Sequence, residues 1–220
     1  MQLLDSHYFQ LISNNGASGD YFGTSVSIYG NYTIIGAPFK TFGTNNQQGA
    51  AYIFYFNGTL WNQQQELISN DGSYNDYFGS SVSIYGNYVI IGAYQKTIGN
   101  NEGQGAAYIF YFNGKSWIQQ QELISSDGAS GDGFGVSVSI YGNYSIIGAL
   151  GKTIRSNSYQ GAAYIFYFNG KSWTQQQELI SSNGATNDFS IKIKNISSSL
   201  LYITSKSFKR STNNSIISIN

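Results

Sequence analysis

Several acidic residues recur at fixed intervals in the 220-residue chain, and carboxylates in repeated positions are candidate ligands for a cation. Asp20, Asp76 and Asp132 are spaced by 56 residues, and Asp71 and Asp127 each precede a glycine. A hard cation such as calcium needs about six to eight oxygen ligands, and two spaced carboxylates supply only a few of them. We therefore favour a role in turns, where aspartate accepts backbone N–H bonds, and keep a cation loop at Asp71, Asp76, Asp127 and Asp132 as the alternative.

Other residues with catalytic chemistry are few and scattered. Glu66, Glu122 and Glu178 recur with the same spacing and invite comparison with the paired carboxylates of a glycosidase. Glutamates at the same position in successive repeats would point away from one another and could not act as a catalytic pair. Keeping an edge strand soluble explains these glutamates better. His7 is the only histidine and cysteine is absent, which excludes a histidine triad and multi-histidine or thiolate metal sites. We predict no catalytic residue and no cofactor, and therefore no enzyme.

These residues recur because the chain is built from repeats of 56 residues. The string SVSIYGNY starts at residues 25, 81 and 137, and GAAYIFYFNG starts at residues 49, 105 and 161. The repeats divide the chain into a partial outer strand of a preceding unit, three full units and a degenerate or truncated fourth repeat. These segments are residues 1–13, 14–69, 70–125, 126–181 and 182–220.

Each unit is predicted to form four antiparallel strands, which in the first unit span residues 25–29, 32–37, 50–56 and 60–68. Gly-Asn and Asn-Gly pairs between these runs favour tight hairpin turns. The strand at 50–56 is apolar on both faces and must be covered on both faces. Radial stacking of equivalent sheets achieves this, whereas a two-layer sandwich would leave one wet face. We predict an all-β fold of β-propeller blades, three four-stranded antiparallel repeats forming an incomplete or open propeller.

A recurring string in the second unit resembles a known repeat. It reads Asp76-Tyr77-Phe78-Gly79-Ser80-Ser81-Val82, then Ile90-Ile91-Gly92-Ala93, then Gly105-Ala106-Ala107-Tyr108-Ile109-Phe110 and Trp117. In the first unit the corresponding glycine and alanine are followed by a proline, which gives Gly36-Ala37-Pro38. The pattern is similar to the FG-GAP repeat, which builds the N-terminal β-propeller of integrin α subunits, and it covers roughly residues 8–189.

The resemblance implies a β-propeller, an extracellular or cell-surface setting, and protein or glycan binding rather than catalysis. It also makes calcium possible, since some integrin blades carry a DxDxDG calcium loop before the GAP strand. Here the tight turn Tyr29-Gly30-Asn31 stands in that position without carboxylates, so family-type calcium sites are not expected. Integrin propellers have seven blades, whereas this chain supplies three.

The connections between strands differ in length, and this asymmetry points to a binding face. In a four-stranded meander the two short turns lie at one end, and the long connections, such as 38–48 and 69–79, lie at the other. Binding residues tend to lie on loops held by a rigid scaffold, although drift in unconstrained loops is the alternative. The candidate contacts are Lys40, Thr41, Phe42, Lys96, Thr97, Ile98, Lys152, Thr153, Ile154 and Arg155.

One tryptophan per unit, at Trp61, Trp117 and Trp173, could stack on a sugar. A tryptophan at a fixed strand position is more typical of packing between blades, and we favour that interpretation. The leading function is therefore a non-catalytic recognition module that binds protein or carbohydrate through the loop face. The alternatives are an accessory propeller fragment of a larger enzyme and a purely structural or non-functional duplicate.

Charge and composition limit the partners. The chain has 11 basic and 11 acidic residues, so no nucleic-acid or anionic-membrane partner is expected. No apolar run approaches the roughly 18 residues of a membrane span. The N-terminus does not read as a signal peptide, so the localisation stays unknown.

The two ends of the repeat array raise a further expectation. Three blades would leave two aromatic-rich sheet faces uncovered, and apolar patches of that size favour self-association, either as a six-blade ring or as aggregates.

Residues 190–220 lack Gly, Asp, Glu and Trp but hold five basic residues. They fit either an atypical capping strand pair or a lost reading frame, and we favour the second.

Overall fold

The computed structural model describes residues 10–181, and in that range it contains twelve β-strands and no helix. Blade 1 consists of β1 (Ser25–Tyr29), β2 (Tyr32–Ala37), β3 (Ala50–Phe56) and β4 (Trp61–Leu67). Blade 2 consists of β5 (Ser81–Tyr85), β6 (Tyr88–Ala93), β7 (Ala106–Phe112) and β8 (Trp117–Leu123). Blade 3 consists of β9 (Phe134–Tyr141), β10 (Tyr144–Ala149), β11 (Ala162–Phe168) and β12 (Trp173–Leu179). Each blade is one antiparallel meander with its strands in sequence order.

The hairpin turns follow from the residues that occupy them. Gly30 takes a φ of 56° between β1 and β2, a left-handed conformation that glycine adopts cheaply. In the turn before β4, the side-chain oxygen of Asn57 accepts the backbone N–H groups of Thr59 and Leu60 at 3.0 and 2.9 Å. The predicted strands of the first unit are confirmed, with the fourth one residue shorter at each end.

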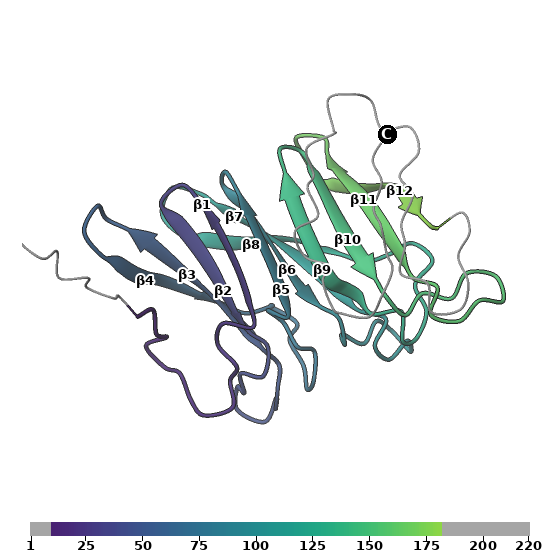
Figure 1. The fold of residues 1–220 in the computed structure, drawn as a ribbon, viewed down its shortest axis with the longest axis horizontal. Coiled ribbons are helices and arrows are strands. Elements are labelled where there is room, and N and C mark those ends of the chain that lie inside the picture. Colours follow the sequence, from purple (N-terminus) through teal and green to yellow (C-terminus); the bar gives the residue numbers. More distant parts are fainter. Residues whose placement is uncertain (1–9, 182–220) are drawn as a thin grey trace, which may run out of the picture.

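The three blades stand side by side in a row, with β1, β5 and β9 next to one another (Figure 1). This arrangement covers both faces of the apolar third strand, as the sequence predicts. Along β7, Tyr108 and Phe110 belong to a cluster shared with blade 1, whereas Ala107 and Ile109 belong to a cluster shared with blade 3. The all-β, propeller-type fold is therefore confirmed, and the three sheets do not close into a barrel.

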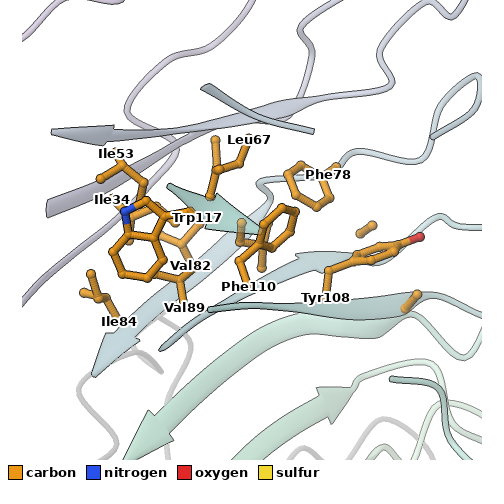
Figure 2. Packing of buried hydrophobic residues seen from close by; sticks show 14 residues of the cluster. Ile34, Ile53, Leu67, Phe78, Val82, Ile84, Val89, Tyr108, Phe110 and Trp117 are labelled. Atoms are coloured by element: carbon orange, nitrogen blue, oxygen red, sulfur yellow. The ribbon is translucent and has the colours of Figure 1, made fainter. Parts of the chain in front are cut away.

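The core lies between blades rather than inside a single sheet. Figure 2 shows Ile34 and Ile53 of blade 1 against Val82 and Trp117 of blade 2. Fully burying one such side chain stabilises a fold by about 1.5–3 kcal/mol, so each contact between blades is a major source of stability. Trp117 and Trp173 are buried in these clusters, which supports the packing role over the sugar-binding one.

Polar side chains join the blades at their outer strands. Gln65 of β4 accepts the backbone N–H of Trp117 and donates to its carbonyl, both at 2.8 Å. Gln121 of β8 makes the same two bonds, at the same distance, with Trp173 of blade 3. The glutamine-rich strands thus dock each blade on the next.

Among the described residues no helix has the length and apolar character that a membrane crossing requires. The predicted fourth repeat at 182–220 lies outside the described residues, as does most of the predicted partial strand at 1–13.

Candidate functional site

The long connections of all three blades lie at the same end of the sheets, opposite the short hairpin turns (Figure 1). They comprise the segments between the second and third strands, residues 38–49, 94–105 and 150–161, and the segments that lead from one blade into the next. We call this end of the molecule the loop face. All the contact residues predicted from the sequence lie in these connections.

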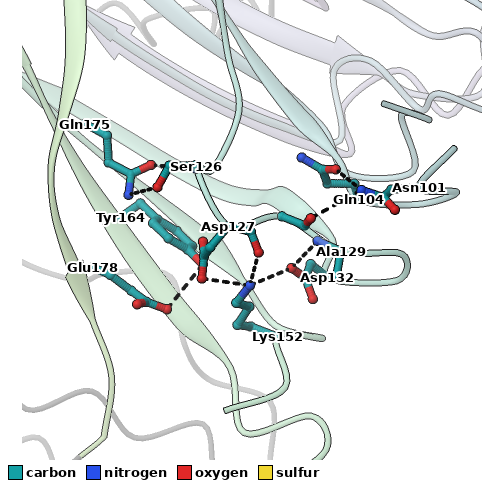
Figure 3. Close-up of polar contacts among 11 residues, drawn as sticks. Asn101, Gln104, Ser126, Asp127, Ala129, Asp132, Lys152, Tyr164, Gln175 and Glu178 are labelled. Atoms are coloured by element: carbon teal, nitrogen blue, oxygen red, sulfur yellow. Dashed lines mark hydrogen bonds and ion pairs between the residues drawn. The ribbon is translucent and has the colours of Figure 1, made fainter. Parts of the chain in front are cut away.

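A buried lysine organises the loop face of each blade, and Figure 3 shows it for blade 3. Lys152 forms ion pairs with Asp127 at 2.9 Å and with Asp132 at 3.1 Å, and it also donates to the backbone carbonyl of Asp127. The hydroxyl of Tyr164 lies 3.0 Å from the other carboxylate oxygen of Asp127 and 3.3 Å from Glu178. These contacts tie the incoming connection to β11 and β12.

The same network recurs in the other blades. In blade 2, Lys96 pairs with Asp71 at 3.0 Å and with Asp76 at 3.1 Å, and the Tyr108 hydroxyl lies 3.0 Å from Asp71. In blade 1, Lys40 pairs with Asp20 at 2.9 Å, and an asparagine, Asn15, stands where the other blades have the second aspartate.

Burial and charge set the protonation states in this network. Burial alone favours the neutral amine of Lys96, but its hydrogen bonds with Asp71 and Asp76 outweigh that effect and raise the pKa. Burial raises the pKa of the Tyr108 hydroxyl, and the charge of Glu122 raises it further. The network therefore holds an ammonium and a protonated phenol together at neutral pH.

The three lysines predicted as ligand contacts have a structural role instead. Lys40, Lys96 and Lys152 are buried, with ammonium groups surrounded by carboxylates and carbonyl oxygens, so they are not surface contacts. They were predicted as ligand contacts because lysine is rarely buried unless it is paired, and the pairing aspartates lie about 20 residues away in the chain.

The aspartates considered as a cation loop do converge, but on these lysines. The cation that Asp71 and Asp76 hold is the ammonium of Lys96, and Asp127 and Asp132 hold that of Lys152. Each of Asp76 and Asp132 also accepts a backbone N–H three residues before it, which is the predicted turn role. Within residues 10–181, no cluster of three or more His, Cys, Asp or Glu side chains is suited to a metal ion.

The remaining predicted contacts keep their place on the loop face. Thr41, Thr97, Thr153 and Arg155 are exposed, whereas Phe42, Ile98 and Ile154 are half-buried and pack against the clusters beneath them. Their part in binding stays a prediction.

Sequence reasoning missed a row of aromatic rings on the same face. Tyr21 packs on Phe39 with ring centroids 4.8 Å apart, Phe39 on Tyr77 at 5.1 Å, and Tyr77 on Tyr94 at 5.6 Å. We call these four residues the aromatic row. It crosses from blade 1 to blade 2, and its first ring, Tyr21, is 64% exposed. The signal in the sequence is the Tyr-Phe-Gly string, which becomes Gly-Phe-Gly at 133–135 in the third unit.

The backbone beneath the aromatic row is strained. Tyr21 and Tyr77 have φ values of 55° and 56°, in the left-handed region that residues with a side chain rarely occupy. The third blade has Gly133 at this position with a φ of 66°, where the conformation costs little. The first two blades therefore keep a tyrosine in a backbone conformation that costs of order 1–3 kcal/mol each and that glycine would adopt with less strain. Strain of this kind tends to cluster at functional sites.

A second tyrosine row lies at the opposite end of the blades. Tyr29, Tyr85 and Tyr141 end the three innermost strands, with ring centroids 4.9 and 4.6 Å apart. Their φ values are not in the left-handed region, and the residue is the same in every repeat. This row follows from the repeat itself and requires no separate functional explanation.

Comparison with known proteins gives the family. The model of the FG-GAP repeat matches three times, at residues 9–54, 61–110 and 117–166. The second and third matches begin at the tryptophans that start β4 and β8 and end in the third strand of the following blade, so each spans a boundary between blades. No curated protein matches the chain. Because the matches cover more than half of the sequence and coincide with the stacked blades, this chain belongs to the FG-GAP repeat family, with its repeats in a β-propeller-like arrangement.

Proposed function

We propose that the chain is a non-catalytic recognition module that binds its ligand through the loop face, at the aromatic row. The observation that carries the proposal is the pair of strained tyrosines, Tyr21 and Tyr77, in a continuous row of rings. Tyrosine offers a large, rigid contact surface at low cost in conformational entropy. The row is held by two stacked blades, which is the arrangement of loops on a rigid scaffold that favours binding.

Carbohydrate is the ligand class that the surroundings favour over protein. The charged groups next to the row, Asp20 and Asp76, are buried and engaged with lysines, so the rings form a neutral surface. Ligand sites commonly combine apolar and aromatic walls with a few polar groups that fix orientation, and the tyrosine hydroxyls of the row supply such groups. An adhesion role at a cell surface, implied by the resemblance to integrin α propellers, depends on this binding.

A recognition role also agrees with the state of the acidic residues. In the described part of the chain, Asp71, Asp127, Glu122 and Glu178 are engaged with buried lysines and tyrosines, which fixes them as structural groups. Catalysis would need an acid or a base free to contact a substrate. These contacts favour binding over an enzymatic role.

The test uses the third blade as a guide. Tyr21→Gly and Tyr77→Gly copy Gly133, so they remove the rings while relieving the backbone strain. On an array of immobilised neutral oligosaccharides we expect the unmodified chain to bind, and each variant to lose about tenfold in affinity or more, as truncation of a tyrosine hot spot does. The folded state should keep its stability to within about 1 kcal/mol, since the lost ring contacts are offset by the relieved strain.

Tyr141→Gly is the matched control, because Tyr141 belongs to the second tyrosine row at the opposite end and is also exposed. Its affinity should equal that of the unmodified chain. Absence of binding to every glycan on the array, or glycan binding that ignores Tyr21 and Tyr77, would contradict the proposal.

A further inference from the structure

The lysine network of blade 1 lacks the second aspartate that the other two blades have. Asn15 stands at the position that Asp71 and Asp127 hold in the following repeats. Asp71 and Asp127 each present one carboxylate oxygen to a tyrosine hydroxyl and the other to the lysine, as Figure 3 shows for blade 3. Among the described residues, Lys40 of blade 1 forms an ion pair with Asp20 only.

The side chain of Asn15 lies in the same contacts as the two aspartates. Its Oδ1 accepts the hydroxyl of Tyr52 at 3.1 Å, as the aspartates accept theirs, and its Nδ2 donates to Glu66 at 3.0 Å. Lys40 donates to the backbone carbonyl of Asn15, as the lysines of the other blades do to their aspartates. An amide nitrogen cannot accept the ammonium, so a carboxylate at this position would give blade 1 the complete network.

The residue after Asn15 makes such a change chemically accessible. Asparagine is a chemically labile residue, and it is most labile before glycine, because no side chain shields the backbone nitrogen that attacks its amide. Asn15 and Gly16 are both exposed, so water and base reach them. Tyr52 donates to Oδ1 of Asn15, the oxygen on which negative charge develops during the attack. The local geometry therefore assists loss of the amide.

We propose that Asn15 is a site of spontaneous deamidation, and that its conversion to aspartate completes the lysine network of blade 1. The backbone nitrogen of Gly16 loses its proton and attacks Cγ of Asn15. The bond from Cγ to the side-chain nitrogen then breaks, and ammonia leaves as a cyclic imide forms. Water opens the imide to aspartate, so the net reaction consumes water and releases ammonia. The new carboxylate pairs with Lys40, as Asp71 pairs with Lys96.

The fold also decides which product persists. Opening of the imide on its other side gives isoaspartate, in which the main chain runs through the side-chain carboxyl carbon. Isoaspartate adds a methylene group to the main chain and displaces the carbonyl that accepts Lys40. Because the imide can form again from isoaspartate, the folded chain favours the product with the better contacts, which is aspartate.

Three hairpin asparagines also precede glycine, but their surroundings differ. Oδ1 of each accepts the backbone N–H groups of the residues two and three positions later, at 2.9–3.0 Å. An aspartate would keep these bonds, and the hairpin tips lie at the end of the blades opposite to the buried lysines (Figure 1). Deamidation of Asn57, Asn113 or Asn169 would therefore add no ion pair with a buried lysine.

The first test follows the amide of Asn15 in the full chain by peptide mapping and mass spectrometry during storage in mildly alkaline buffer. We expect the peptide that contains Asn15 to acquire the mass of the aspartate form, and fragmentation to identify aspartate as the main product. Gly16→Ala should slow the conversion severalfold, because its methyl group shields the attacking nitrogen. The fold should tolerate this change, since Gly16 has no left-handed φ and the added Cβ would meet only the flexible Ser13 side chain closely.

The second test compares the thermal stability of Asn15→Asp with that of Asn14→Asp. Both substitutions add the same charge to the same exposed turn, but only the first places it beside the ammonium of Lys40. The midpoint of unfolding should rise by about 2–4 °C in Asn15→Asp, as a modest gain in stability gives a chain of this size, and stay level in Asn14→Asp. An Asn15 that keeps its amide, conversion to isoaspartate alone, or equal midpoints of the two variants would each overturn the proposal.

Discussion

At the scale of single residues, the buried lysine in each blade decides how the loop face is built. Its ammonium joins a connection that arrives from the previous blade to the segment that leads into the third strand. The sequence shows the lysines and aspartates as recurring charges and does not show that they meet. Only the fold brings Asp76 and Lys96, 20 residues apart, to 3.1 Å.

Lys96→Met tests this role. The substitution leaves Asp76 buried without its counter-charge, and removal of one partner from a buried ion pair costs about 3–5 kcal/mol. Urea denaturation should show a loss of that size in the free energy of unfolding. Lys115→Met, at an exposed lysine of the same blade, should change it by less than about 0.5 kcal/mol. Equal effects of the two substitutions would mean that the ion pair is unimportant.

Because of the same lysine and tyrosine side chains, we expect the stability of the fold to be sensitive to alkaline pH. The pKa values of Lys96 and Lys152 are raised above 10.5, and those of Tyr108 and Tyr164 above 10.0. A raised pKa means that the folded chain binds the proton more tightly than the unfolded chain does. The bound proton therefore stabilises the fold fully below the pKa of the unfolded chain, and this stabilisation is lost as the pH rises through the pKa of the folded chain. The free energy of unfolding should therefore fall above a pH of about 10.

Urea titrations across that range would measure the fall. Tyr108→Phe with Tyr164→Phe should make it shallower, because two of the titrating groups are gone. A free energy of unfolding that stays level through this range would contradict the prediction.

At the scale of the elements, glycine allows neighbouring blades to approach closely. A Cβ atom on Gly36 would lie 1.9 Å from the carbonyl oxygen of Gly79, and one on Gly92 would lie 1.9 Å from that of Gly135. Both glycines belong to the Gly-Ala part of the FG-GAP pattern. The family signature therefore encodes contact between blades, which explains why the second and third family matches each span a blade boundary.

Gly92→Ala should consequently separate blades 2 and 3, because the backbone of one of them must shift. We expect a loss of about 1–3 kcal/mol, typical of overpacking a well-filled contact. Gly148→Ala is a matched control in blade 3, where the nearest atom to the added methyl is the flexible Ser137 hydroxyl. Thermal unfolding should show Gly92→Ala as the more destabilising of the two, and the reverse order would contradict the close-approach argument.

At the scale of the whole molecule, the three described blades form a short linear array, in which blades 1 and 3 share no core cluster. Stability in such arrays is approximately a sum over repeats and the contacts between them. Phe134 is fully buried in the cluster shared by blades 2 and 3, with its ring 5.4 Å from that of Tyr164. Blade 1 does not contribute to that cluster.

Phe134→Ala should therefore loosen blade 3 and leave blade 1 largely intact. Loss of a buried phenylalanine costs about 3–5 kcal/mol, and hydrogen exchange would locate the effect. Amides of β9 to β12 should exchange faster, while those of β1 to β4 keep most of their protection. A uniform increase over all three blades would show that the array unfolds as one unit.

Several features could be predicted from the residues alone: the period, the four strands of each unit, the turns between them and the stacking of blades. These features depend on local turn chemistry and on a third strand that is apolar on both faces, and both are visible in a string of about ten residues. The exposed or buried state of a charged side chain is not local. Lys40, Lys96 and Lys152 read as surface residues, and only the tertiary structure shows that each meets its aspartate.

The tertiary structure also decided the composition of the candidate site. Tyr21 and Phe39 come from different connections, and Tyr77 and Tyr94 from two more, so no spacing in the sequence predicts that their rings touch. The left-handed backbone at Tyr21 and Tyr77 is likewise set by the surrounding packing, because tyrosine on its own avoids that conformation. Repeat patterns fix an architecture through short-range forces, whereas a site assembled from several loops exists only after the blades have packed.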